Sequence, residues 1–262
     1  MDRHERISAL LAMLAKDGKV EVDQAVEALG ASPATIRRDL VYLDEQRLAT
    51  RTHGGAIANS GSFDLPLRFK TGRAVEEKQR IGEAAAGLAA AGSVVAINGG
   101  TTTLEVARAL AARPDLAARE GAGPALTIVT NAVNVAGELL VRPYFKVVVT
   151  GGVVRAHSYE LFGPLAERSI ESLSVDLTFL GVDGFDPAFG ASAFSDAEAS
   201  TNSLLVEASA KVVVVADSTK IGRRAFAQIC PPASVDTLVT DGGVPPEWQA
   251  RVQAAGIEVI TA

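Results

Sequence analysis

Hydrophobic and polar positions divide the chain into two parts with different periods. Apolar side chains recur at helical spacing in the first 57 residues, whereas short β-branched runs alternate with alanine-rich helical stretches after residue 75. The runs are SVVAIN, LTIVTN, FKVVVTGG, VDLTFLGVDG, AKVVVVADS, TLVTDGG and GIEVITA. This alternation predicts an α/β domain with about seven strands in a mostly parallel sheet covered by helices.

The segment between the two parts has no clear period. Residues 58–75, ANSGSFDLPLRFKTGRAV, contain Gly, Ser, Asn and Pro, as linkers do. We therefore expect a small unit at 1–57, a linker at 58–75 and a larger α/β domain at 76–262.

The small unit has the helix start and stop signals of a helix-turn-helix. Apolar stripes within 7–14, 22–29 and 36–43 give three helices one packed face each. Gly30 makes the turn before the third helix, and Ser32 is a good N-cap that is followed by proline. The stretch LATRTHGGAI then predicts a β-hairpin wing with a tight glycine turn.

The third helix presents polar side chains where a recognition helix contacts DNA. With its apolar stripe inward, Arg37 and Arg38 lie near the helix start, and arginine is suited to bidentate contacts with guanine. A solvated face balanced by Asp39 or Asp44 is the alternative. The candidate DNA-binding residues are Ser32, Thr35, Arg37, Arg38, Arg51, His53 and Gly54.

Composition limits the partners. The chain has 25 Lys+Arg and 31 Asp+Glu, a net charge of -6, so any DNA contact must be local. The single cysteine, Cys230, excludes an intrachain disulfide framework and a cysteine-based zinc site, and neither it nor His157 is given a function. We expect no metal and no cofactor. Without a signal peptide or an apolar run of roughly 20 residues, the chain is predicted to be cytoplasmic and to have no membrane partner.

The larger domain carries a candidate anion site. AINGGTTTLEVA predicts a strand, a Gly-Gly turn and a helix whose unpaired N–H groups and threonine hydroxyls fit one phosphate. A well-capped turn without a ligand is the alternative. The stretch lacks the Gly-Lys-Ser/Thr ending of a nucleoside triphosphate loop, so no nucleotide hydrolysis is expected.

Other strand ends fall on the same edge of the sheet, where open α/β sheets bind ligands. Asn131 can both donate to and accept from a sugar hydroxyl. For Thr130, Gly151 and Gly152, ordinary turn chemistry is an equally good explanation.

These motifs resemble a known family. SPATIRRDLVYLDEQ followed by RTHGGA is similar to the winged helix-turn-helix of DeoR-type bacterial transcriptional regulators. The resemblance continues through nearly the whole chain, at EEKQRIGEAAAGL, INGGTTTLEVARAL, IVTNAVNVA, VVVTGGVVR, FLGVDGFD and VVVVADSTKIGRRAF. It implies a C-terminal domain with the fold of ribose-5-phosphate isomerase, which senses a phosphorylated sugar or similar metabolite.

The resemblance also favours particular ligand contacts. It implies Asp183 and Lys220 as contacts, with Arg155, Glu198 and Arg223 as weaker candidates, whereas a salt bridge or a capped loop is the competing explanation. The candidate effector-binding residues are Gly99, Gly100, Thr101, Thr102, Thr103, Thr130, Asn131, Gly151, Gly152, Asp183 and Lys220.

Three positions depart from the family pattern. Asn98 and Gly99 stand where many members have an aspartate and a small residue, so a carboxylate that would bind a sugar hydroxyl is absent. Arg47 stands where a glycine usually ends the recognition helix, and Asn202 stands where a lysine is common.

Two functions follow as hypotheses. The first is a homo-oligomeric regulator, a dimer or larger, that binds double-stranded operator DNA, represses genes of sugar or carbohydrate metabolism and responds to a phosphorylated sugar without catalysing a reaction. The alternative is a sugar-phosphate isomerase-like enzyme fused to a DNA-binding head, with Asp183 or Glu198 as general base.

Overall fold

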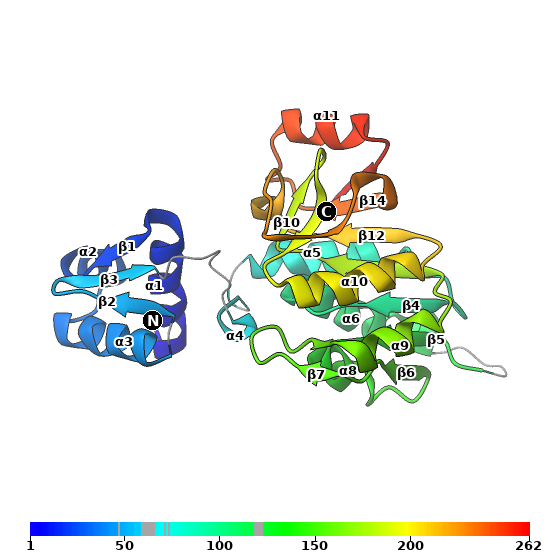
Figure 1. Ribbon diagram of the computed structural model, residues 1–262, viewed down its shortest axis with the longest axis horizontal. Helices are drawn as coiled ribbons and strands as arrows, with labels where there is room; N and C mark the ends of the chain where they lie inside the picture. Colours follow the sequence, from blue (N-terminus) through cyan, green and yellow to red (C-terminus); the bar gives the residue numbers. More distant parts are fainter. Residues whose placement is uncertain (47, 59–65, 71, 73, 118–122) are drawn as a thin grey trace. The chain divides into compact units, whose positions relative to one another are not determined.

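A computed structural model describes residues 1–46, 48–58, 66–70, 72, 74–117 and 123–262. The chain divides into two compact units, Met1–Arg73 and Ala74–Ala262 (Figure 1). Within these described ranges, no helix is both long enough and apolar enough to span a bilayer.

The first unit is a winged helix-turn-helix, as the sequence predicts. The predicted helices and the hairpin are present, and an additional strand completes a three-stranded sheet in the order β1-β3-β2. The sequence does not predict β1, which is only three residues long and pairs with a strand more than thirty residues later. The elements are α1 (Arg3–Asp17), β1 (Lys19–Glu21), α2 (Val22–Leu29), α3 (Pro33–Glu45), β2 (Ala49–Arg51) and β3 (Gly55–Ala58).

Local signals set the ends of these helices. Asp2 and Glu5 form a capping box at the start of α1. Gly18 and Gly30 end α1 and α2 in the left-handed conformation, with φ of 72° and 61°, which glycine adopts without a steric penalty. The turn between α2 and α3 therefore depends on Gly30, as the sequence indicates.

Part of the expected linker belongs to the first unit. Helix α4 (Leu67–Lys70) lies within the 58–75 range that had no clear period. Leu67 and Phe69 are 5% and 3% exposed, and Phe69 packs into the core of the first unit. One turn of helix is too short to produce a recognisable apolar period in the sequence.

A buried ion pair joins α1 to α3. Asp39 is 1% exposed, and its carboxylate binds the Arg6 guanidinium and lies 3.7 Å from Nε of Arg3. Arg3 also stacks over the ring of Tyr42, with 4.6 Å between its Cζ and the ring centroid. Asp39 is therefore satisfied inside the unit and does not neutralise the arginines on the outer face of α3.

The second unit is built on the predicted parallel sheet. All seven expected strands are present, each neighbouring pair is parallel, and their order is β15-β14-β12-β9-β4-β5-β6. The strands are β4 (Val94–Ile97), β5 (Leu126–Thr130), β6 (Phe145–Val149), β9 (Leu177–Gly181), β12 (Val212–Val215), β14 (Thr237–Thr240) and β15 (Glu258–Thr261).

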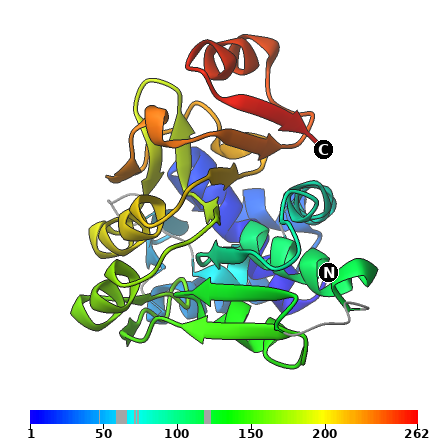
Figure 2. The same cartoon turned by 90° about the vertical axis from the view of Figure 1, so that its right-hand side faces the viewer.

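Helices cover both faces of this sheet, so the strands read as continuous apolar runs (Figure 1). Val213 and Val215 of β12 pack on the side of α5, α6 and α8, whereas Val212 and Val214 pack on the side of α10 and α11. Figure 2 shows the chain ending on β15, beside α11. The helices are α5 (Val75–Ala86), α6 (Thr101–Ala112), α7 (Pro114–Ala117), α8 (Val133–Leu139), α9 (Pro164–Glu171), α10 (Asp196–Glu207) and α11 (Pro246–Ala254).

Two small antiparallel groups accompany the sheet and are not predicted from the sequence. Strands β7 (Val153–Val154) and β8 (Leu161–Phe162) form a ribbon. Strands β10 (Gly184–Asp186), β11 (Gly190–Ala193) and β13 (Ala227–Cys230) form a second, three-stranded sheet. Short 3-10 turns lie at η1 (Ser218–Lys220) and η2 (Pro232–Ser234).

Candidate functional site

The start of α3 offers a polar, exposed face. Ser32 caps the helix, because its hydroxyl accepts the N–H of Thr35 at 3.2 Å. Arg37 and Arg38 are exposed, while Ile36 and Leu40 point into the core. Within the described ranges, neither arginine has an acidic partner, so both guanidinium groups are available to an external anion.

The wing lies beside this helix in the sequence and in the fold. Arg51, His53 and Gly54 are exposed at the β2–β3 turn, and the main-chain N–H of Arg51 donates to Asp44 at 3.1 Å. Asp44 thus holds the wing against α3 and, like Asp39, does not pair with the arginines of the helix.

Position 55 requires glycine because the neighbouring main chain leaves no room for a Cβ atom, and not because of its backbone angle. A Cβ added there would lie 1.9 Å from the main-chain oxygen of Val20 in β1, whereas its φ is not in the left-handed region. The tight glycine turn predicted from the sequence is therefore a close approach between two strands. Arg47, whose helix-ending cap departs from the family pattern, lies outside the described residues.

In the second unit, the expected anion site opens α6. Gly100 is the N-cap, with φ 148°, and Thr101, Thr102 and Thr103 form the first turn. In the described part of the chain, no acceptor is found for the N–H groups of these threonines. The Thr103 hydroxyl is buried and has no partner there either. The helix start therefore keeps the donors that a phosphate needs.

Asn98 is a structural residue of this edge. Its amide nitrogen donates to the Gly181 oxygen at 3.0 Å, and its Oδ1 accepts the Gly181 N–H at 2.7 Å. The pair joins the end of β4 to the end of β9. An aspartate could not donate the first of these bonds, so the amide at this position fits the main chain that it binds.

Glu160, which the sequence analysis does not single out, lies among the candidate residues. It is 3% exposed, and its Oε1 accepts the Gly99 N–H at 2.7 Å. A Cβ on Gly99 would lie 2.4 Å from Cγ of Glu160, so the glycine makes room for the glutamate. Because Gly99 donates to Glu160, its N–H is not free for a phosphate, and the available donors begin at Gly100.

A strained turn delivers Glu160 to this place. Tyr159 has φ 63°, one of two positive values among the described non-glycine residues. Two main-chain hydrogen bonds close the turn. The Arg155 N–H donates to the main-chain oxygen of Glu160 at 2.8 Å, and the Tyr159 N–H donates to the main-chain oxygen of Arg155 at 2.8 Å. Leu161 N–H then donates to the main-chain oxygen of Asn131 at 2.6 Å, which sets Glu160 beside the end of β5.

Glu160 continues into a chain of buried amides. Asn202 donates to its Oε2 at 3.2 Å, and Asn131 donates in turn to Oδ1 of Asn202 at 3.0 Å. Burial raises the pKa of Glu160 well above its usual range, and the charges of Glu198 and Asp183 add to this, whereas the Gly99 and Asn202 donors oppose it. The Asn202 departure from the family pattern therefore places an amide, not a cation, against this carboxyl.

Glu198 and Asp183 have partners of their own. Glu198 is bound by Arg155 at 3.1 Å and by the Ser158 hydroxyl. Asp183 accepts the Phe194 N–H at 3.2 Å. The structure thus contains the salt bridge of Glu198, a weaker candidate, and a main-chain contact of Asp183, a favoured one, as the competing explanation expects.

Lys220 is half-buried on η1, and two carboxylates hold this turn. Asp217 caps it, and Asp241, beyond the end of β14, accepts the N–H groups of Ser218 at 2.6 Å and Gly243 at 2.9 Å. Although burial by itself raises the pKa of Asp241, these donors hold it below its usual range. Arg223 is exposed three residues beyond the turn.

Three expected contacts have a structural explanation. The Thr130 hydroxyl donates to the Ile97 oxygen at 2.6 Å and accepts the Ala132 N–H at 3.0 Å, which uses its only donor. Gly151 and Gly152 have φ of 75° and 116°, and a Cβ on Gly152 would lie 2.7 Å from the Phe162 oxygen. These residues form the strand end and the turn into β7, the alternative that the sequence left open.

The two unassigned residues stay without a function. His157 is exposed, and Cys230 is buried, which raises the pKa of its thiol to about 11. Across the described residues, no group of three or more His, Cys, Asp and Glu side chains is arranged to hold a metal ion.

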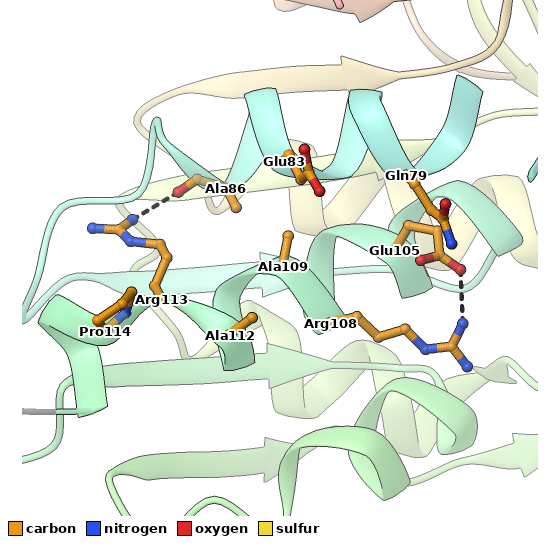
Figure 3. A pocket seen from close by; sticks show the side chains of 9 residues that line it. All are labelled: Gln79, Glu83, Ala86, Glu105, Arg108, Ala109, Ala112, Arg113 and Pro114. Atoms are coloured by element: carbon orange, nitrogen blue, oxygen red, sulfur yellow. Dashed lines mark hydrogen bonds and ion pairs between the residues drawn. The ribbon is translucent and has the colours of Figure 1, made fainter. Parts of the chain in front are cut away.

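A groove of about 410 Å³ lies elsewhere, between α5 and α6 (Figure 3). Its two arginines are engaged, since Arg108 binds Glu105 at 2.7 Å and Arg113 donates to the Ala86 oxygen at 2.7 Å. It contains none of the predicted effector contacts and lies along the helices, not at their start. The lining residues are Gln79, Glu83, Ala86, Glu105, Arg108, Ala109, Ala112, Arg113 and Pro114.

Comparison with known families divides the chain in the same way. Residues 6–62 match a DeoR-like helix-turn-helix domain, and residues 73–242 match a DeoR C-terminal sensor domain. The chain is 35% identical to the HTH-type transcriptional regulator GlpR of Haloferax volcanii, over 99% of this chain and 96% of the relative. It is 33% identical to the glycerol-3-phosphate regulon repressor of Escherichia coli, over 94% of this chain and 93% of the relative.

Solved structures give weaker likenesses. The full-length sorbitol operon regulator SorC of Klebsiella pneumoniae has 12% identity and a TM-score of 0.40, covering 94% of this chain and 98% of SorC. Ribose-5-phosphate isomerase A of Methanocaldococcus jannaschii has 14% identity and a TM-score of 0.41, covering 56% of this chain and 54% of the isomerase. Nothing about the chemistry of this chain follows from values this low.

The contact between Gly99 and Glu160 predicts a double-mutant coupling. Gly99→Ala should lower the free energy of unfolding by about 1–3 kcal/mol, because the new methyl group overlaps Glu160. In a Glu160→Ala background the same change should cost less, with a coupling of about 0.5–3 kcal/mol. Denaturation followed by fluorescence of the single tryptophan, Trp248 of the second unit, measures all four states.

Gly137→Ala in α8 is the matched control. A Cβ there meets no atom within 4 Å, so this variant should be as stable as the wild type or more stable by about 0.5–1 kcal/mol. Equal costs of Gly99→Ala with and without Glu160 would show that the two residues are not in contact.

Proposed function

Because this chain belongs to the DeoR family of DNA-binding transcriptional regulators, we propose that it represses genes of sugar metabolism and is released from its operator by a phosphorylated sugar. The observation that carries the proposal is the exposed pair Arg37 and Arg38 at a capped helix start, with the nearby acid Asp39 already bound to Arg6 inside the unit. A repressor named for the glycerol-3-phosphate regulon, which aligns over almost its whole length, supports both the direction of control and the phosphate ester.

In this proposal α3 enters a major groove and the wing contacts the adjacent backbone. Arginine side chains near the start of a recognition helix reach base edges, while Ser32 and the helix N-terminus suit a phosphate of the DNA. Such readers usually bind two half-sites as symmetric dimers, and we include a homo-oligomer in the proposal for that reason. With a net charge of -6 over the whole chain, these few cations supply the attraction locally.

The effector belongs at the edge of the parallel sheet. The free N–H groups and hydroxyls of Thr101–Thr103 suit a phosphate, and half-buried Lys220 supplies a cation from a turn fixed by Asp217 and Asp241. The effector must bind the DNA-incompetent state more tightly, and a coupling of about 1–3 kcal/mol changes operator affinity roughly 5- to 150-fold. The two expected bases of an isomerase, Asp183 and Glu198, are engaged with other groups, so we propose regulation without catalysis.

Replacing the recognition arginines should weaken operator binding. Arg37→Ala or Arg38→Ala should weaken binding by about 1–3 kcal/mol where a base is contacted, or lower the salt slope by about 1 where a phosphate is contacted. Fluorescence anisotropy on DNA from upstream of the chain's own gene, at two salt concentrations, measures both quantities. Arg168→Ala, an exposed arginine of α9, is the control and should bind like the wild type. Wild-type binding by both α3 variants would refute the assignment of the recognition helix.

Effector release is tested in the same assay. A panel of sugar phosphates added to the complex should contain an ester that lowers the anisotropy of the operator. Thr102→Ala and Lys220→Ala should bind DNA normally and need a higher concentration of that ester, because each removes a proposed phosphate contact. If no ester changes binding, the proposed effector class is wrong. Conversion of an aldose phosphate to a ketose phosphate would instead establish the isomerase.

A further inference from the structure

The hydrogen bonds around Glu160 have a fixed direction. Its Oε1 faces the Gly99 N–H and its Oε2 faces the Asn202 amide nitrogen, so both oxygens accept from nitrogen. Asn202 must therefore turn its Oδ1 away from Glu160 and toward Asn131. Asn131 meets that oxygen with its amide nitrogen, at 3.0 Å. The direction follows from two accepting oxygens, which the ionised carboxylate provides; a protonated Glu160 would instead offer an O–H donor to Asn202.

The direction leaves one acceptor without a donor. Asn131 is fully buried, and its Oδ1 has no hydrogen-bond partner among the described residues. Thr103 Oγ1, at the start of α6, is also buried and unpartnered there. Thr103 lies between the turn after β4 and the end of β9, since Cβ atoms added at Gly100 and Gly181 would each lie 3.0 Å from its side chain. Buried polar atoms without partners are rare in native proteins, and two of the seven such side-chain atoms among the described residues belong to predicted effector contacts.

Several carboxylates lie near Glu160, at the other end of this chain of amides. Glu198 and Asp183 are close enough to Glu160 for their charges to act on it; Glu160 and Glu198 are buried, and Asp183 is half-buried. Arg155 binds Glu198 at 3.1 Å. A ligand group placed against Asn131 Oδ1 therefore meets an acceptor on a chain of amides that leads to these carboxylates, which favours a neutral donor and disfavours a carboxylate.

We propose that Glu160 is a positioning residue for effector specificity: by directing Asn202 and Asn131 it presents Asn131 Oδ1 to the ligand, so that the site selects a phosphate ester with a hydroxyl at its far end and rejects the corresponding phosphorylated sugar acid. This inference rests on the proposed function and deepens it, because it specifies the chemistry of the effector at the end opposite its phosphate. Toward the ligand, Asn131, which the sequence predicts to donate and accept, only accepts, because its amide nitrogen donates to Asn202.

Glu160→Gln tests the direction of the bonds with almost no change in shape. Glutamine offers one oxygen and one NH₂ group, and the Gly99 N–H requires the oxygen. The NH₂ group then faces Asn202, whose amide must turn to accept from it. Asn131 must turn as well, and its NH₂ group replaces Oδ1 as the atom presented to the ligand. The variant should therefore lose its preference for the hydroxyl compound.

Isothermal titration calorimetry of the full chain with two matched pairs of compounds measures this preference. The pairs are glycerol 3-phosphate with 3-phosphoglycerate, and glucitol 6-phosphate with 6-phosphogluconate; in each, a CH₂OH group is replaced by a carboxylate. The wild type should bind the alcohol of at least one pair at least about tenfold more tightly than its acid. In Glu160→Gln that ratio should fall by about tenfold or more.

Glu207→Gln is the matched control, since it removes an exposed carboxylate from α10, the helix that carries Asn202. It should keep the wild-type ratio. Trp248 fluorescence and operator binding should show that both variants are folded. A lower ratio in Glu160→Gln alone supports the inference, because a general loss of stability would weaken both members of a pair equally.

The inference is overturned if Glu160→Gln binds with the wild-type ratio, or if the wild type prefers the acids or binds none of the four compounds. These results would not test the proposed regulatory function, which the anisotropy assay tests separately. A chain that is released from DNA by some sugar phosphate but shows an unchanged ratio retains the proposed function and loses this inference. A chain that no sugar phosphate releases loses the proposed effector first.

Discussion

In a parallel sheet every strand ends at the same edge, and this constraint decides where the chemistry of the second unit lies. The ends of β4, β5 and β9 bring Asn98, Asn131 and Gly181 to one edge, although more than eighty residues separate the first from the last. Helix α6 begins there because it follows β4 directly. The unpaired N–H groups at the start of α6 and the buried carboxyl of Glu160 thus become neighbours through the topology of the sheet. The groove between α5 and α6 has volume, but the ends of the described strands do not converge on it.

The first unit separates its internal charges from those it offers to a partner. Asp39 is buried and holds α1 against α3 through Arg6, while Arg37 and Arg38 stay on the exposed side of the same helix. Breaking a buried pair of this kind by removing one partner commonly costs about 3–5 kcal/mol, so the acid is committed to the fold. An acidic chain can therefore keep a local cationic face for DNA.

Local sequence patterns predict most of the helices and strands, but not the contacts between residues far apart in the chain. The seven strands and the helix at Pro33–Glu45 are confirmed, because each has an apolar run or a cap that can be recognised locally. Strand β1 and helix α4 are missed because they are very short. Glu160 is missed because its importance comes from Gly99 and Asn202, 61 and 42 residues away in the chain. The Thr130 hydroxyl is satisfied by Ile97, which no local pattern could indicate. The site assignments themselves remain predictions.

Hydrogen exchange measured by mass spectrometry on the full chain tests most directly the claim that DNA and effector use different, specified surfaces. The operator should slow exchange in peptides from α3 and the wing, residues 32–58. The phosphate ester that releases the operator should slow exchange in peptides covering 98–104 and 155–162, where the start of α6 and Glu160 lie. Slowed exchange confined to the second half of α6 and to α7, beside the α5–α6 groove, would contradict this account and move the effector site to that groove.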